Sequence, residues 1–212
     1  MGIELSSDRA AQLIAYLDAI LDENMRVNLT SILDREDAVV RHVLDSLSVV
    51  PIWHELEGPE PPRNVIDLGT GGGFPAIPIA VMWPDARVHA CDSRGKKVKA
   101  IARALEVAGG PSNVEPRNVR VEQIAGLHRG MKGTVDLLVA RAVGHTSNVL
   151  KSASRLMRPG GLVFSMKGPE PPADEVEDAS NLAAKIRFSP LRPRSTSVPH
   201  LLARTVLVYR RR

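Results

Sequence analysis

Apolar residues in the first fifty positions recur at intervals of three and four, which is the spacing of one buried helix face. One such segment runs from Ser7 to Leu21 and a second from Asp34 to Val50, and each begins at a residue able to cap a helix. Residues 28–31, with the sequence Asn-Leu-Thr-Ser, are typical of a turn between them. The pattern therefore predicts two amphipathic helices in this part of the chain.

The pattern changes after a proline-rich connector at residues 57–62. Apolar runs predict strands at residues 65–68, 87–91, 135–139 and 162–166, a strand built from 114 and 119–121, and two closing strands at 185–191 and 202–209. Helical segments at 77–83, 96–108 and 149–157 alternate with the strands. This order predicts an α/β fold with a mostly parallel seven-stranded sheet and helices on both faces. We expect an N-terminal helical extension (1–57) packed as one unit with a sheet-containing domain (63–212).

Composition excludes several classes of protein. The chain has 212 residues, 43% of them apolar and 25% charged, which is typical of one soluble globular domain. No apolar run approaches the roughly 20 residues needed to span a bilayer, and the first residues do not have the pattern of a signal peptide. A single cysteine, Cys91, has no partner for an internal disulfide, which fits a reducing compartment. We therefore expect a cytoplasmic protein without a membrane partner, and we also expect a monomer.

The charge distribution raises the question of RNA binding. The net charge is +4 and the isoelectric point is about 9.5, with basic residues grouped at 94–103 and again at 192–212. Such groups are suited to contacts with phosphates, but they equally suit a solvated surface. Aromatic residues make up only 3% of the chain, so platforms for base stacking are scarce. Charge alone leaves both readings open.

The segment 67–75, Asp-Leu-Gly-Thr-Gly-Gly-Gly-Phe-Pro, carries the most specific chemistry. A strand that ends near Asp67 runs into glycines, which let a ligand approach the backbone closely. About 20 residues later, at the end of the next predicted strand, Asp92 is placed to accept hydrogen bonds from two ribose hydroxyls. These features predict a nucleotide-type cofactor.

Two cofactors compete for this loop. Residues 71–76 satisfy the letters of the dinucleotide fingerprint, so NAD is one candidate. However, Asp67 at the glycine loop would repel a pyrophosphate, whereas it suits a ligand that carries an ammonium and a sulfonium. The rest of the chain is also too short for the substrate domain of a dehydrogenase. We therefore favour S-adenosylmethionine.

With these residues in view, the chain resembles the ribosomal RNA small-subunit methyltransferase G family, also called glucose-inhibited division protein B. The resemblance extends from Asn28 to the C-terminus. It rests on the motifs at residues 28–31, 41–46, 67–78, 92–98, 120–122, 141–142 and 166–168. The chain departs from the family pattern at Glu23 and at residues 143–145, Val-Gly-His. The resemblance implies a Rossmann-like class I methyltransferase that uses S-adenosylmethionine to methylate N7 of a guanosine in 16S ribosomal RNA, with the small ribosomal subunit as its partner.

The resemblance also implies roles for individual residues. Cofactor contacts are implied at Gly69, Gly71, Phe74, Asp92, Ser93, Val121, Glu122 and Arg141. Asp92 would hold the ribose, Val121 and Glu122 would meet the adenine, and Arg141 would lie near the methionine carboxylate or the incoming base. Substrate contacts are implied at Arg41, His42 and Lys167. For Arg41 and His42 the alternative is a structural cluster with Asp45 and Ser46 that pins the helix to the sheet, and for Lys167 it is a solvated lysine.

The sequence lacks the motifs of several other catalytic mechanisms. The place where amine methyltransferases carry an Asn/Asp-Pro-Pro-aromatic motif is occupied by Ala140-Arg141-Ala142, and no cysteine stands there for covalent catalysis. No group of histidines and cysteines has metal-binding spacing, so we expect no metal. Because guanine N7 carries a lone pair and no proton, we also expect no catalytic general base. Two alternatives remain open, namely a small-molecule methyltransferase and a protein that binds cofactor and RNA without turnover.

Overall fold

The structure is a computed structural model and describes residues 2–120, 123–124, 129–201 and 203–212. Its strands are β1 (Asn64–Leu68), β2 (Arg87–Asp92), β3 (Val114–Asn118), β4 (Val135–Arg141), β5 (Met157–Lys167), β6 (Phe188–Pro190), β7 (Arg194–Thr196) and β8 (Arg204–Arg211). Its helices are α1 (Ser7–Asn24), α2 (Arg35–Ala38), the π-helix η1 (Val39–Leu44), α3 (Asp45–Leu47), α4 (Val49–Glu57), α5 (Ala76–Met82), α6 (Gly95–Ala108), the 3-10 helix η3 (Arg129–Met131), α8 (Thr146–Ala153) and α9 (Ala173–Lys185). Strands and helices therefore alternate from β1 to β6, as predicted.

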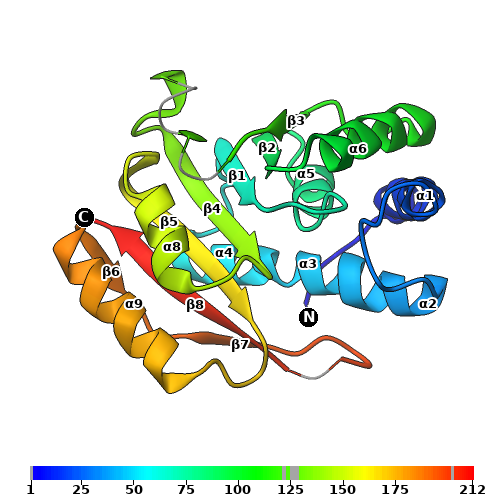
Figure 1. Cartoon of the computed structure of the whole chain (residues 1–212). Coiled ribbons are helices and arrows are strands. Elements are labelled where there is room, and N and C mark those ends of the chain that lie inside the picture. Colours follow the sequence, from blue (N-terminus) through cyan, green and yellow to red (C-terminus); the bar gives the residue numbers. More distant parts are fainter. Residues whose placement is uncertain (1, 121–122, 125–128, 202) are drawn as a thin grey trace.

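In the described part of the chain, the strands form one eight-stranded sheet (Figure 1). The order is β3-β2-β1-β4-β5-β8-β6, and β7 pairs with β8 beside this path. Strands β1 to β5 are parallel to their neighbours among these five, whereas β8 is antiparallel to β5, β6 and β7. The predicted α/β class with a mostly parallel sheet is confirmed.

Helices cover both faces of the sheet because successive strand residues point to opposite sides. Ile66 and Leu138 pack in one cluster with residues of α8 and α9, whereas the adjacent residues Val65 and Leu137 pack with residues of α4 and α5. All four side chains are fully buried. The sheet is thus the middle layer of the fold, with a separate apolar core on each face.

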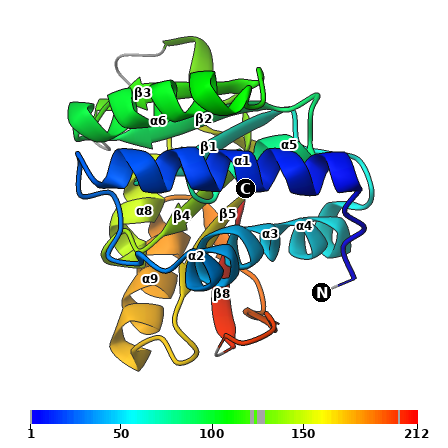
Figure 2. The same cartoon turned by 90° about the vertical axis from the view of Figure 1, so that its right-hand side faces the viewer.

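The N-terminal helix α1 lies outside these layers, alongside α6 (Figure 2). Its buried face, which includes Leu13 and Leu17, shares an apolar cluster with Ile77 of α5 and Ile101 of α6. The hydroxyl of Tyr16 donates a hydrogen bond to the Gly72 carbonyl at 3.0 Å. The helix therefore supports the glycine loop directly.

The second predicted helix is longer and less regular than expected. Residues 35–57 form the sequence α2, η1, α3 and α4, whereas the pattern predicted one helix at 34–50. Pro51 does not end the helix, because it lies in the first turn of α4, where a missing amide hydrogen costs no intrahelical bond. The connector accordingly begins at Gly58, after Glu57.

Other elements also differ from the prediction in number and in their bounds. The segment between the two predicted closing strands contributes β7, so the described residues form eight strands instead of the predicted seven. β3 ends at Asn118, so Val119 and Arg120 follow the strand, and Lys185 belongs to α9. α8 ends at Ala153, and β5 begins at Met157, where a register shift against β4 accommodates residues 159–161, Pro-Gly-Gly. Short strand ends and bulges of this kind depend on sheet pairing, which local sequence does not reveal.

Candidate functional site

The order of the strands creates a crevice at the carboxyl ends of β1 and β4. After β1 the chain builds β2 and β3 on one side, and it then returns to build β4 and β5 on the other. Open α/β sheets bind ligands at such a point, because the connections on the two sides diverge there. A cavity of about 430 Å³ occupies this place, which is within the usual size of small-molecule sites, roughly 300–1,000 Å³.

The loop after β1 forms one wall of this cavity, which we call the cofactor cavity. Gly69 and Gly73 adopt φ angles of +74° and +90°, a region that disfavours other residues. A Cβ atom at Gly69 would lie 2.3 Å from the Val143 side chain, and one at Gly73 would lie 2.3 Å from the Tyr16 hydroxyl. Glycine at these positions therefore allows the loop to pass close to Val143, which follows β4, and to Tyr16 of α1.

Asp92 ends β2 and lines the same cavity. Its Oδ2 accepts a hydrogen bond from the Gly71 amide at 3.1 Å, and its Oδ1 accepts one from the Arg94 amide at 2.8 Å. Because a carboxylate offers about four acceptor positions, each oxygen retains capacity for one more donor. The two remaining positions, on a side chain that is 9% exposed, suit the adjacent hydroxyls of a ribose.

A buried carboxylate lies beneath the glycine loop. Asp67 is fully buried and does not line the cofactor cavity, whereas its neighbour Thr70 does. A hydrogen bond with Thr70 favours the ionised form of Asp67 and partly offsets the effect of burial on its pKa. Asp67 Oδ2 accepts a hydrogen bond from the Ala76 amide at 2.9 Å. Burial raises the pKa of Asp67 to about 6, so most Asp67 side chains are ionised at pH 7.

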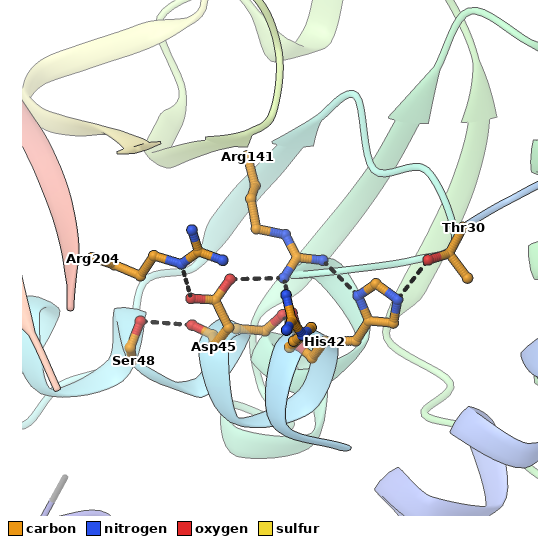
Figure 3. A network of polar contacts seen from close by, with 8 residues as sticks. Thr30, His42, Asp45, Ser48, Arg141 and Arg204 are labelled. Atoms are coloured by element: carbon orange, nitrogen blue, oxygen red, sulfur yellow. Dashed lines mark hydrogen bonds and ion pairs between the residues drawn. The ribbon is translucent and has the colours of Figure 1, made fainter. Parts of the chain in front are cut away.

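Arg141, at the end of β4, connects the sheet to the N-terminal helices (Figure 3). Its Nη1 donates to Asp45 Oδ2 at 3.0 Å and to the Arg41 carbonyl at 2.9 Å. Arg204 pairs with the other oxygen of Asp45, at 3.3 Å from its Nε. The side chain of Asp45 is only 2% exposed, so two guanidinium groups compensate one buried carboxylate.

His42 lies between Arg141 and Thr30 in the same network (Figure 3). Its Nδ1 is 3.5 Å from Arg141 Nη2, and its Nε2 is 2.9 Å from Thr30 Oγ1. Burial, together with the positive charge of Arg141, lowers the pKa of His42 to about 4. The ring is therefore neutral at physiological pH.

A second cavity of about 530 Å³ adjoins the first, and we call it the entrance cavity. The residues shared by both cavities are Leu29, Thr30, His42, Arg141 and Ala142. Its wall also contains the basic residues Arg41, Lys167 and Arg204. The shared wall means that a ligand in one cavity lies next to a ligand in the other.

Lys167 in the entrance cavity is held by the fold. Its Nζ lies 2.5 Å from Glu175 Oε1 and donates to the Gly144 carbonyl at 2.7 Å. Burial opposes ionisation of Glu175, but the ion pair with Lys167 and hydrogen bonds from Thr146 outweigh it and lower the pKa of Glu175 to about 2. The side chain of Lys167 is 14% exposed, so the alternative of a fully solvated lysine is wrong.

The structure brings most of the predicted site residues together. Those that line the cofactor cavity are Gly69, Gly71, Phe74, Asp92, Ser93 and Arg141. Arg41, His42 and Lys167 line the entrance cavity, whereas Val121 and Glu122 lie outside the described residues. Sequence reasoning gave no role to Thr30, Thr70 or Arg204. A role for Thr30 could have been predicted, because it lies in the motif 28–31, which is one of the motifs that resemble the family.

Comparison with known proteins decides the family. Residues 9–201 match the GidB family, described as rRNA small subunit methyltransferase G. The chain belongs to this family. The family predicted from the glycine loop and the accompanying motifs is confirmed.

Individual members and a solved structure agree with the family and the fold. The "Ribosomal RNA small subunit methyltransferase G" of Cellvibrio japonicus is 36% identical over 190 residues, which cover 89% of this chain and 80% of that protein. The protein of the same name from Alteromonas mediterranea is 32% identical over 209 residues, covering 99% and 90%. The crystal structure of an O-methyltransferase from Bacillus cereus in complex with SAH superposes with a TM-score of 0.65 at 17% identity, covering 93% and 91%. This last likeness supports the class I methyltransferase fold.

Two further observations describe what the structure contains. Among the residues it describes, no group of three or more histidine, cysteine, aspartate or glutamate side chains is arranged to hold a metal ion. None of the described helices is both long and apolar enough to cross a membrane.

Proposed function

We propose that this methyltransferase transfers a methyl group from S-adenosylmethionine to N7 of a guanosine in 16S ribosomal RNA. Membership of the family and the names of the relatives support ribosomal RNA of the small subunit as the substrate. The protein would act as a monomer on the small subunit in the cytoplasm. The resemblance of residues 28–31, 41–46 and 67–78 to the family motifs carries the choice of N7.

The observation that carries the proposal is the wall shared by the two cavities. The cofactor cavity offers Asp92 to a ribose, and Thr70 contributes a hydroxyl to its wall. When bound, S-adenosylmethionine supplies a methyl group on a sulfonium, which a nucleophile takes directly.

In the entrance cavity, Arg41 lies 3.6 Å from Asp37 and Lys167 pairs with Glu175. The positive charge offered to a phosphate-rich substrate is therefore the excess of the basic side chains, which include Arg141 and Arg204, over these acids and Asp45. Because His42 and its neighbours line both cavities, the methyl group and the attacking nitrogen would meet where the two cavities adjoin.

The chain contributes positioning to this reaction, and no proton transfer is needed. Guanine N7 has a lone pair in the plane of the ring and carries no proton, so no base is required to activate it. The side chains nearest to the shared wall are poorly suited to act as a base, because the pKa of His42 is lowered to about 4 and Asp45 is paired with two arginines. Alignment of the nucleophile with the methyl carbon supplies the rate enhancement.

The test uses purified protein, methyl-labelled cofactor and small ribosomal subunits from cells that lack this gene. We expect label in 16S RNA, with large subunits and free guanosine as controls that remain unlabelled. Incorporation should fall steeply as salt rises through roughly 50–200 mM, because phosphate contacts are lost. Cofactor binding without incorporation would favour a binding protein without turnover. Salt-independent methylation of free guanosine would favour a small-molecule enzyme.

A further inference from the structure

We propose that the hydroxyl of Thr30 selects guanine by donating a hydrogen bond to O6 of the base whose N7 is methylated. This inference rests on the proposed function. Thr30 is half-buried and belongs to both the cofactor cavity and the entrance cavity, so its side chain lies where a base must present N7 to the methyl group. On the Hoogsteen edge of guanine, O6 is the acceptor next to N7.

The backbone of Thr30 is fixed by one buried side chain. Asn24, at the end of α1, is 6% exposed. Its Oδ1 accepts hydrogen bonds from the amides of Leu29 at 2.7 Å and Thr30 at 3.0 Å, and its Nδ2 donates to the Thr30 carbonyl at 3.0 Å. The loop therefore presents the hydroxyl from a defined position, and a specificity contact needs this precision.

The hydroxyl oxygen of Thr30 already accepts from two donors. The Ile32 amide donates to it at 3.1 Å. The second donor is His42, whose tautomer follows from its other neighbour: a guanidinium only donates, so Nδ1 accepts from Arg141 and the ring proton is on Nε2. Nε2 then donates to Thr30 Oγ1 at 2.9 Å, as drawn in Figure 3. The low pKa of His42 keeps the ring in this neutral form.

With both lone pairs occupied, the Thr30 hydroxyl is able only to donate. Guanine presents two acceptors, N7 and O6, whereas adenine presents N7 and an amino group that donates. A donor-only hydroxyl next to N7 matches O6 and opposes the adenine amino group. Arg141 can only donate, so it fixes the tautomer of His42, and His42 in turn leaves the Thr30 hydroxyl as a donor toward the base. This one hydroxyl is enough to distinguish guanine from adenine.

The test compares two substrates and three proteins by single-turnover methyl transfer. Small subunits are reconstituted with 16S RNA that carries either guanosine or 2-aminopurine, which lacks O6, at the modified position. Wild type should favour guanosine about tenfold or more, as expected for one hydrogen bond. Thr30→Val, which removes the hydroxyl at nearly constant shape, should lower the rate on guanosine about tenfold more than the rate on 2-aminopurine, because the lost contacts with the Ile32 amide and His42 affect both substrates alike. Thr30→Ser, which keeps the hydroxyl, should retain the preference.

The ratio between substrates separates this inference from a structural role and from the proposed function. If Thr30→Val slows both substrates by the same factor, the hydroxyl only supports the loop and the inference is overturned. If wild type transfers no methyl group to guanosine RNA, the proposed function itself fails. The tautomer gives an independent readout, because nitrogen-15 NMR of His42 should show a neutral ring protonated at Nε2. A ring protonated at Nδ1 would overturn the inference.

Discussion

The ring of His42 stacks on the ring of Phe74, with centroids 5.0 Å apart and planes inclined by 14°. Phe74 belongs to the glycine loop after β1, and His42 belongs to η1, so the contact joins the cofactor loop to the N-terminal helices. Both ring nitrogens of His42 contact neighbours, Thr30 and Arg141. Because the ring is held on its face and at both nitrogens, it is suited to position the wall shared by the two cavities. Its low pKa makes it a weak base.

The rate of methyl transfer should therefore be nearly independent of pH between about 7 and 9, because a general base would produce a limb at its own pKa. Below this window Asp67 begins to take up protons, since burial raises its pKa to about 6. The measurement is single-turnover transfer at saturating cofactor and RNA. His42→Ala should lower the rate by a similar factor at every pH. A limb near neutral pH that disappears in His42→Ala or Asp45→Asn would contradict proton-free chemistry.

Replacing Asp92 by alanine should weaken S-adenosylmethionine binding by about 2 kcal/mol or more, roughly 30-fold in Kd. The reason is that two ribose hydroxyls lose a charged acceptor, while the Gly71 amide also loses its partner. Titration calorimetry measures the change. Asp85→Ala, which removes an exposed carboxylate before β2, is the matched control and should leave Kd unchanged. An unaltered affinity in Asp92→Ala would show that another residue holds the ribose.

Glu175 should stabilise the fold above pH 4.5 and lose this effect in acid. Its pKa is lowered from 4.5 to about 2 in the folded protein, so folding favours the ionised form. The contribution is complete above the unfolded value and disappears as pH falls from about 4.5 to 2. With allowance for solvent screening, we expect Glu175→Gln to lower the free energy of unfolding at pH 7 by about 2 kcal/mol.

Urea unfolding of wild type and Glu175→Gln at several pH values measures this difference. It should shrink steadily between pH 4.5 and 2. Glu177→Gln, an exposed position on the same helix, controls for the loss of one negative charge. A difference that stays constant in acid would mean that the effect of Glu175 does not arise from its ionised form.

The α/β order and the cofactor side of the site were predictable because local sequence determines them. Glycines after a short apolar run and an aspartate at the end of the next strand, Asp92, mark a βαβ unit whatever surrounds it. Parallel strands then bring Asp92 and Arg141 to one edge of the sheet, because both end their strands there.

The entrance side was less predictable because its contacts join distant parts of the chain. Asp45 pairs with Arg141 and with Arg204, which are 96 and 159 positions away. The polar residues at 41–46 indicated that this helix has polar contacts. Which residues make those contacts depends on how the helical segment lies against β4 and β8. For the same reason the departure at Glu23 became interpretable only in the structure, where it pairs with Arg103 of α6.

The most direct test of the account is a map of N7-methylguanosine in 16S ribosomal RNA. RNA is taken from cells that lack this gene and from the same cells carrying either the wild-type gene or Asp92→Ala, and is then cleaved chemically at N7-methylguanosine. We expect one cleavage site that is absent without the gene, restored by wild type, and absent or strongly reduced with Asp92→Ala. An identical cleavage pattern in all strains would contradict guanosine N7 methylation by this protein.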